Sequence, residues 1–325
     1  EIAHDNLRAA LTWLTEIGDT TRAVRLAGSL WQFWWWRSHL GEGRNRLEAA
    51  IALPGADACG AWYARALTGI GALAETQGAY EDAETYHERA VAAWEALDDT
   101  KGLATSLLFR WLVAFNADDQ TRMAALSAES MRLFRELGDP WGIAMSQMEQ
   151  GVMAMRVRDH VGAERVLAEG IAGFRAIGDA WGVAICQGVA GNVATDRGDF
   201  KTAATELKAS LTTLLLLDDL WGVATIMPAS ARMAAEQGAF EQSVQISGAI
   251  MRMHRTMGAP LKVPFRERYE RNLEIARGAL GEQRFDRALA AGEAMTPSDA
   301  VKVAIEPIAA AQPEPSTGLD KLAIP

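Results

Sequence analysis

The fold of this chain is decided by Leu137-Gly138-Asp139-Pro140-Trp141-Gly142-Ile143-Ala144, because nearly the same eight residues return twice further along. The later copies are Ile177-Gly178-Asp179-Ala180-Trp181-Gly182-Val183-Ala184 and Leu217-Asp218-Asp219-Leu220-Trp221-Gly222-Val223-Ala224, and a weaker copy precedes them at Leu97-Asp98-Asp99-Thr100-Lys101-Gly102-Leu103-Ala104. Aspartate, glycine and alanine recur at a spacing of 40 residues in all four copies. A fixed period of this length is typical of a solenoid built from repeated helical units.

Each copy of this phrase predicts the start of a helix. Asp139 suits the N-cap position, and Pro140 suits the first helical position, where its missing N–H costs no hydrogen bond. We expect Trp141 to be a buried anchor against the preceding helix and Gly142 to be a site of close approach. The same structural roles are predicted for the matching residues of the copies, namely Asp99, Gly102, Asp139, Trp141, Gly142, Asp179, Trp181, Gly182, Asp219, Trp221 and Gly222.

A second repeated feature divides each unit into two helices. It occurs at Gln77-Gly78-Ala79-Tyr80, Arg197-Gly198-Asp199-Phe200 and Gln237-Gly238-Ala239-Phe240. Glycine at this place suits the left-handed residue that ends a helix. The sequence therefore predicts an all-α fold, a right-handed superhelix (α-solenoid) of tetratricopeptide-like (TPR-like) helix pairs.

The repeat divides the chain into four segments. Residues 1–19 are expected to form an N-terminal helix that joins an upstream module missing from this sequence, and residues 20–260 to form the TPR-like array. Residues 261–306 predict C-terminal capping helices, since the end of an array needs atypical helices with a polar outer face. Residues 307–325, rich in alanine and proline, predict a disordered tail or linker.

One predicted helix carries an unusual aromatic run, Trp31-Gln32-Phe33-Trp34-Trp35-Trp36. Its rings surround the helix on every side, and a helix that is apolar all round has to be buried. We favour packing in the first unit, or at a seam to a neighbouring module, over a ligand-stacking site, because aromatic helices are most often core.

Composition excludes several function classes. The net charge of −10 argues against direct nucleic-acid binding by this segment, which needs clustered basic residues. No apolar run reaches the length of a membrane span, so no membrane association is expected. Cys59 and Cys186 lie far apart in the sequence, which argues against a disulfide framework and favours a reducing cytoplasm. We therefore predict a cytoplasmic location.

The sequence shows no recognisable catalytic, cofactor or metal motif. The five histidines are scattered without metal-ligand spacing, and there is no phosphate-binding loop or nucleophile elbow. The carboxylate pairs Asp98-Asp99 and Asp218-Asp219 are explained by capping of the repeated helix rather than by acid–base catalysis. We predict no catalytic, cofactor-binding or metal-binding residue, and no enzymatic activity in this chain.

Binding to a concave groove is the remaining function. In stacked helix pairs the first helices usually line the concave side, where repeat proteins hold ligands. Solvated helix faces without a partner are the alternative for any single polar residue there. The polar residues that interrupt the predicted first helices, and so are candidates for contact with a ligand or partner, are Arg110, Gln147, Gln150, Gln187, Asn192 and Arg232.

Several phrases together resemble a known family. They are Asp5-Asn6-Leu7-Arg8-Ala9-Ala10-Leu11, Leu30-Trp31-Gln32-Phe33-Trp34-Trp35-Trp36-Arg37-Ser38-His39-Leu40-Gly41-Glu42-Gly43, the repeated Leu-Gly-Asp-x-Trp-Gly-(Ile/Val)-Ala, Gly258-Ala259-Pro260, and Thr296-Pro297-Ser298-Asp299-Ala300-Val301. This combination, over residues 1–306, is similar to the C-terminal TPR-like (MalT-like) region of bacterial STAND-class ATPases and LuxR-type transcriptional regulators. The resemblance implies an upstream nucleotide-binding module in the full-length protein, and often a DNA-binding helix-turn-helix after the array. Neither is present in this sequence.

The resemblance implies the effector-binding and protein-interaction (sensor or scaffold) region of a bacterial ATP-dependent signalling or transcriptional regulator. A protein or peptide partner, or a small-molecule effector, is expected. A free-standing TPR adaptor that mediates protein–protein interaction is the second hypothesis, and a helical-repeat enzyme is the third. Residues that differ between the copies, such as Lys101 in place of tryptophan, are where function is expected to lie.

Overall fold

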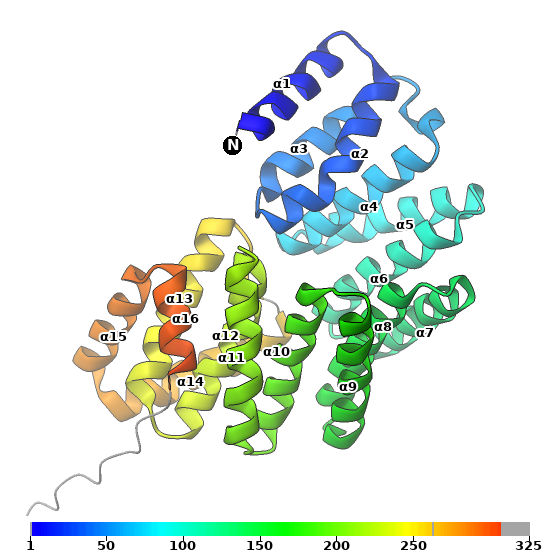
Figure 1. The fold of residues 1–325 in the computed structure, drawn as a ribbon. Helices are drawn as coiled ribbons and strands as arrows, with labels where there is room; N and C mark the ends of the chain where they lie inside the picture. Colours follow the sequence, from blue (N-terminus) through cyan, green and yellow to red (C-terminus); the bar gives the residue numbers. More distant parts are fainter. Residues whose placement is uncertain (1, 262, 307–325) are drawn as a thin grey trace, which may run out of the picture.

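The computed structural model describes residues 2–261 and 263–306 (Figure 1). These residues form α-helices joined by short turns, with one 3₁₀ helix at Ala56–Cys59, so the predicted all-α fold is confirmed. None of the described helices is long and apolar enough to cross a membrane. The predicted disordered tail at 307–325 lies outside the described residues.

The helices alternate between first and second members of successive pairs. A separate helix, α1 (Ile2–Glu16), precedes them. The first helices are α2 (Thr20–Trp36), α4 (Ala61–Thr76), α6 (Thr100–Asn116), α8 (Pro140–Arg156), α10 (Ala180–Asp196) and α12 (Leu220–Glu236). The second helices are α3 (Leu40–Ile51), α5 (Tyr80–Ala96), α7 (Gln120–Leu137), α9 (His160–Ala176), α11 (Phe200–Leu216) and α13 (Phe240–Met257).

The turns inside the pairs have the predicted left-handed backbone. Gly78, Gly198 and Gly238 have φ angles of 81°, 75° and 78°. The turns between successive pairs also contain a left-handed residue. Where these turns lack glycine, Asp98 and Asp218 adopt this conformation, with φ angles of 51° and 58°. In each aspartate pair, therefore, the first residue forms the turn and the second is free to cap the next helix.

The aspartates of the repeated phrase are N-caps, as the sequence predicts. Asp139 accepts hydrogen bonds from the backbone N–H groups of Trp141 at 3.1 Å and Gly142 at 3.2 Å. These bonds satisfy N–H groups that the first turn of a helix leaves without a partner. Asp99, Asp179 and Asp219 make the equivalent bond to Gly102, Gly182 and Gly222 at 2.8, 3.0 and 2.9 Å.

The glycine of the phrase is a site of close approach, but the residue it approaches was not predicted. A Cβ at Gly142 would overlap the ring of Phe134, which lies on α7 and is fully buried. Trp141 was expected to be the buried anchor, and it is only half-buried. The anchor is therefore the aromatic residue of the preceding helix. Trp94 against Gly102 and Phe174 against Gly182 make the equivalent contacts.

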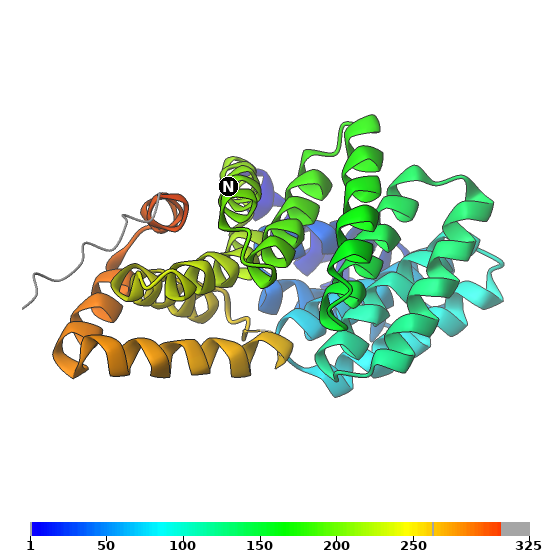
Figure 2. The same cartoon turned by 90° about the horizontal axis from the view of Figure 1, so that it is seen from below.

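The superhelix brings the first unit against units that come much later in the sequence, as Figures 1 and 2 show. The ring of Trp35 on α2 lies 6.3 Å from that of Trp181 and 5.3 Å from that of Trp221, measured between centroids. Next to it, Arg37 pairs with Asp218 at 2.5 Å. The inner faces of distant pairs therefore meet across the interior of the curve.

Three further helices follow the pairs: α14 (Val263–Leu280), α15 (Glu282–Ala294) and α16 (Pro297–Ile305). The backbones of α13 and α15 approach closely at Gly248 and Gly292, where a Cβ would overlap the opposite main chain. Thr296 caps α16, because its side chain accepts a hydrogen bond from the N–H of Asp299 at 3.2 Å. The assignment of residues 261–306 as a capping segment, and the boundary at residue 19, stay predictions.

Candidate functional site

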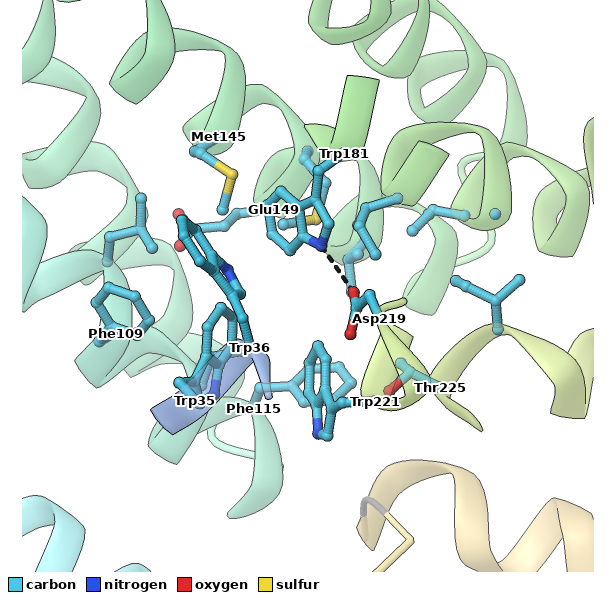
Figure 3. Close-up of a pocket in the computed structure, with 18 of the residues that line it drawn as sticks. Trp35, Trp36, Phe109, Phe115, Met145, Glu149, Trp181, Asp219, Trp221 and Thr225 are labelled. Atoms are coloured by element: carbon cyan, nitrogen blue, oxygen red, sulfur yellow. Dashed lines mark hydrogen bonds between the residues drawn. The ribbon is translucent and has the colours of Figure 1, made fainter. Parts of the chain in front are cut away.

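A cavity of about 580 Å³ lies on the inner side of the superhelix (Figure 3). Its wall is built by α2, α6, α8, α10 and α12, which are all first helices of their pairs. The prediction that first helices line the concave side is therefore confirmed. The volume is in the range of pockets that hold small molecules.

The cavity wall is predominantly aromatic. Seven of the 11 tryptophans of the chain contribute to it, together with two phenylalanines and three methionines. The 40-residue period explains part of this set, since it places the tryptophan of each phrase on the same face of three successive first helices. These aromatic and methionine residues are Trp31, Trp35, Trp36, Trp111, Trp141, Trp181, Trp221, Phe109, Phe115, Met145, Met148 and Met155.

The tryptophan run of α2 has two faces with different roles. Trp34 points into its own unit, where a Cβ at Gly43 would lie 2.6 Å from its Cβ, and it is buried. Trp35 faces the cavity, its ring 5.8 Å from that of Phe109 in a T-shaped arrangement. Trp36 also lines the cavity and is 50% exposed. The prediction that the aromatic run packs in the core therefore applies to the face of α2 that carries Trp34. For the face that carries Trp35 and Trp36, ligand stacking stays a hypothesis.

One carboxyl group in this apolar wall has no hydrogen-bond partner. Glu149 on α8 is 1% exposed, and neither of its oxygens is hydrogen-bonded within the described residues. Burial raises the pKa of Glu149 well above its ordinary value, while the nearby Ser127 hydroxyl of α7 acts in the opposite direction. Burial at this position therefore favours the neutral form of the carboxyl over the ionised form.

The repeat itself shows that Glu149 is exceptional. The equivalent residues are Phe109 one period before it, Val189 one period after it and Ala229 two periods after it, and all of them line the same cavity. Three of the four copies thus fill this wall position with an apolar side chain. Sequence reasoning missed Glu149, although a charged residue at i+8 from Trp141, on the apolar stripe of a helix, was a usable signal.

Replacing Glu149 with methionine should stabilise the ligand-free protein. We expect the free energy of unfolding to rise by about 1–3 kcal/mol, the cost of a buried polar group without a partner. Because the folded-state pKa is raised, ionisation destabilises the fold increasingly as the pH rises above the ordinary glutamate value. The gain from Glu149→Met should therefore be larger at pH 8 than at pH 5 in thermal or urea unfolding.

The control for this prediction is Glu95→Met, because Glu95 is an exposed residue of α5. It should change the free energy of unfolding by no more than about 0.5 kcal/mol at either pH. A Glu149→Met protein that is less stable than the wild type at pH 8 would show that the carboxyl has a partner in solution.

Two further carboxylates and one arginine belong to the wall. Asp219 accepts a hydrogen bond from the indole Nε1 of Trp181 at 2.8 Å as well as from the Gly222 N–H (Figure 3). Burial raises its pKa, and these two hydrogen bonds oppose the rise. Asp179 caps α10, and Arg37 pairs with Asp218. Among the described lining residues, acidic groups therefore outnumber basic ones.

The position held by Lys101 is explained by the same geometry. Its ammonium lies 2.8 Å from Asp139, the capping aspartate of the next unit, just as the indole of Trp181 contacts Asp219. Burial alone would raise the pKa of Asp139, but Lys101 and the Gly142 N–H hold it below its ordinary value. Lys101 thus replaces one inter-unit contact with another, and any further role stays a hypothesis.

Arg110 and Gln147, two of the six predicted groove residues, are directed toward neighbouring second helices. Arg110 pairs with Glu84 of α5, and Gln147 donates a hydrogen bond to Glu169 of α9 at 3.1 Å. The cavity wall of α8 consists of residues 141, 145, 148, 149, 152 and 155, a stripe at helical spacing. Residue 147 lies off this stripe, which explains why Gln147 does not line the cavity.

The other four candidates also differ from one another. Gln150 and Gln187 are half-buried and are not among the cavity-lining residues. Asn192 does line the cavity. Arg232 is buried between α10 and α12, where it pairs with Asp196, and with Asn192 it borders a small neighbouring hollow of about 30 Å³. A binding role for these six residues stays a prediction.

Comparison with known proteins supports the fold. A solved structure titled as a Rap protein complexed with Competence and Sporulation Factor is similar over 84% of this chain and 76% of that chain, with a TM-score of 0.57 and 9% sequence identity. At this identity the likeness shows the helical-repeat fold alone. No protein-family model and no curated protein matches the sequence.

Proposed function

We propose that this chain is the effector-binding region of a bacterial ATP-dependent signalling or transcriptional regulator, and that it is not itself catalytic. The observation that carries this proposal is the aromatic cavity, which is built from five first helices and contains a buried carboxyl without a partner. The similarity of the sequence to the TPR-like region of STAND-class regulators supports the wider context, in which the nucleotide-binding module is a separate part.

The location of the cavity supports a role in switching. Trp35 and Trp36 come from the first pair, whereas Trp181 and Trp221 come from pairs far along the chain. A ligand that contacts both groups would favour the curvature of the superhelix that brings them together. A binding switch needs such differential affinity between two states, and the flanking modules would respond to the change in curvature.

The proposal predicts that small molecules stabilise the protein only when no substituted side chain fills the cavity. In a thermal-shift screen of a diverse small-molecule library, bound ligands should raise the melting temperature of the wild type. Ala229→Phe, which places in the wall the residue found at the equivalent Phe109, should remove these shifts. Val189→Phe is a second filling variant in case the first folds poorly.

The matched control is Leu216→Phe, since Leu216 is 81% exposed on the outer helix α11. It should keep every shift seen with the wild type. If the same compounds still stabilise both filling variants, they bind elsewhere and the cavity is not the effector site. In the full-length protein, a bound effector should also change nucleotide hydrolysis.

A protein-interaction adaptor is the second candidate. The observation in its favour is the fold, which resembles a Rap protein solved in a complex. A pulldown with the wild type and with Ala229→Phe separates the two functions. A partner captured equally by both proteins would support an adaptor surface outside the cavity.

A further inference from the structure

We infer that the effector is a hydrophobic organic cation, held between the ring faces of the cavity tryptophans, with Glu149 as its counter-charge. This inference rests on the proposed function, because it names the chemical class of the ligand that the cavity binds. A quaternary ammonium, a phosphonium or a protonated aryl amine has this chemistry.

The first argument is that the fold does not need Glu149. A buried carboxyl without a hydrogen bond destabilises the protein, and the equivalent positions Phe109, Val189 and Ala229 show that apolar residues complete the wall. A destabilising polar group inside a cavity is a common property of functional sites. Glu149 is therefore placed to interact with a ligand rather than with the protein.

The second argument concerns the sign of the ligand charge. The charged residues of the wall within the described chain are Glu149, Asp179, Asp219 and Arg37. Arg37 is already paired with Asp218 at 2.5 Å, so its charge is compensated. Among the described residues, the wall therefore offers an anionic ligand no uncompensated basic side chain. It offers a cationic ligand carboxyl groups that can carry the opposite charge, and opposite charges attract more strongly in an apolar environment than in water. A cation is favoured.

The third argument is the arrangement of the rings. Around Trp35, the ring planes of Trp181 and Trp221 are inclined by 67° and 46°, so the rings face different directions around one region. Figure 3 shows Trp36, Trp181, Trp221 and Asp219 around an open space. Ring faces carry partial negative charge and attract cations, and this attraction is strongest where water is excluded.

Binding of a cation should be coupled to loss of a proton from Glu149. Burial raises the pKa of Glu149, and a positive charge beside the carboxyl would lower it again by favouring the ionised form. The affinity for a cation should therefore rise with pH through the raised pKa of Glu149. Of the other wall groups, Asp219 also has a pKa raised by burial and contributes in the same direction, whereas α6 supplies only apolar wall residues.

The test uses three probes of related shape and different charge. They are tetraphenylphosphonium (positive), triphenylphosphine oxide (neutral) and tetraphenylborate (negative), and binding is measured by titration calorimetry in two buffers with different ionisation enthalpies. Tetraphenylphosphonium should bind most tightly and should release protons. Because its own charge does not titrate, any rise in affinity between pH 6 and pH 8 belongs to the protein.

The decisive variant is Glu149→Gln. It should weaken tetraphenylphosphonium binding about 10- to 100-fold, the range expected for loss of a buried ionic partner, and should reduce the proton release. Binding of triphenylphosphine oxide should be unchanged. Glu149→Met, which removes the polar group altogether, should show the same loss, and the exposed Glu95→Gln is the control that should leave all three affinities unaltered.

The outcomes separate this inference from the proposed function. If the neutral or the negative probe binds as tightly as the cation, or if Glu149→Gln leaves cation binding intact, the charge assignment is overturned. Should that binding still disappear in Ala229→Phe, the cavity remains the effector site. If none of the probes binds and the library screen finds no ligand of the cavity, both proposals are wrong.

Discussion

Replacing Phe134 with alanine should lower the free energy of unfolding by about 3–5 kcal/mol, the range for loss of a fully buried phenylalanine. Phe134 has no exposed surface and lies on the second helix α7, in contact with Gly142 at the start of the next unit. The ring therefore joins two successive helix pairs. Urea denaturation followed by circular dichroism measures the loss, and Phe174→Ala should behave in the same way one period later.

Gly142→Ala provides the second half of this test. In the wild type the added Cβ would overlap the ring of Phe134, so we expect a loss of about 1–3 kcal/mol from overpacking. In the Phe134→Ala background the same substitution has room and should instead stabilise, because alanine favours a helix over glycine by about 1 kcal/mol. A change of sign in the stability effect of Gly142→Ala between the two backgrounds would show that residue 142 and the Phe134 ring are in direct contact.

The matched control is Gly278→Ala in α14, where nothing lies within 4 Å of the added Cβ. It should be neutral or stabilising by up to about 1 kcal/mol. A Gly142→Ala protein as stable as Gly278→Ala, or one with the same effect in both Phe134 backgrounds, would contradict the assignment of Gly142 as a contact point.

Arg232→Met should lower the free energy of unfolding by about 3 kcal/mol, the lower end of the range for breaking a buried ion pair. The side chain of Arg232 is 6% exposed, pairs with Asp196, and donates a hydrogen bond to the carbonyl oxygen of Asn192 at 2.9 Å. We expect the lower end of this range because Arg268, which lies 3.1 Å from Asp196, would still compensate part of the charge of Asp196 in the variant. Removal of Arg232 thus leaves Asp196 incompletely compensated between α10 and α12.

A double variant distinguishes the ion pair from a ligand-binding role. Arg232→Met combined with Asp196→Asn should recover most of the lost stability, because the uncompensated charge is removed together with its partner. The sequence predicted Arg232 as a groove residue. If Arg232→Met unfolds at the same urea concentration as the wild type but loses ligand stabilisation in the thermal-shift screen, that prediction is correct and the structural role is minor.

Local chemistry explains which parts of the fold were predictable. Asp139 caps α8 through bonds to residues two and three positions away, and Gly198 ends α10 through its own backbone angle. Such interactions depend only on neighbours in the sequence, so a repeated phrase reports them directly. The 40-residue period then extends one unit to the whole array.

The candidate site was predicted only in outline. The sequence indicated that first helices line the concave side, and it marked Asn192, which does line the cavity. It assigned Trp181 and Trp221 to structural anchoring, and it did not single out Glu149. Repetition made the tryptophans look like elements of the scaffold, whereas the exception at position 149 became visible only when Phe109, Val189 and Ala229 were seen in the same wall.

The sequence by itself determined the helices, their caps and their turns, because each of these is fixed by residues within a few positions of one another. It also determined the period, because the same phrase recurs every 40 residues. Only the tertiary structure decided that Trp35 would meet Trp181 and Trp221 across a cavity. That meeting depends on the curvature of the superhelix, which is the sum of small rotations between successive pairs. Those rotations are set by contacts such as the Phe134 ring against Gly142, and no single phrase of the sequence contains their sum.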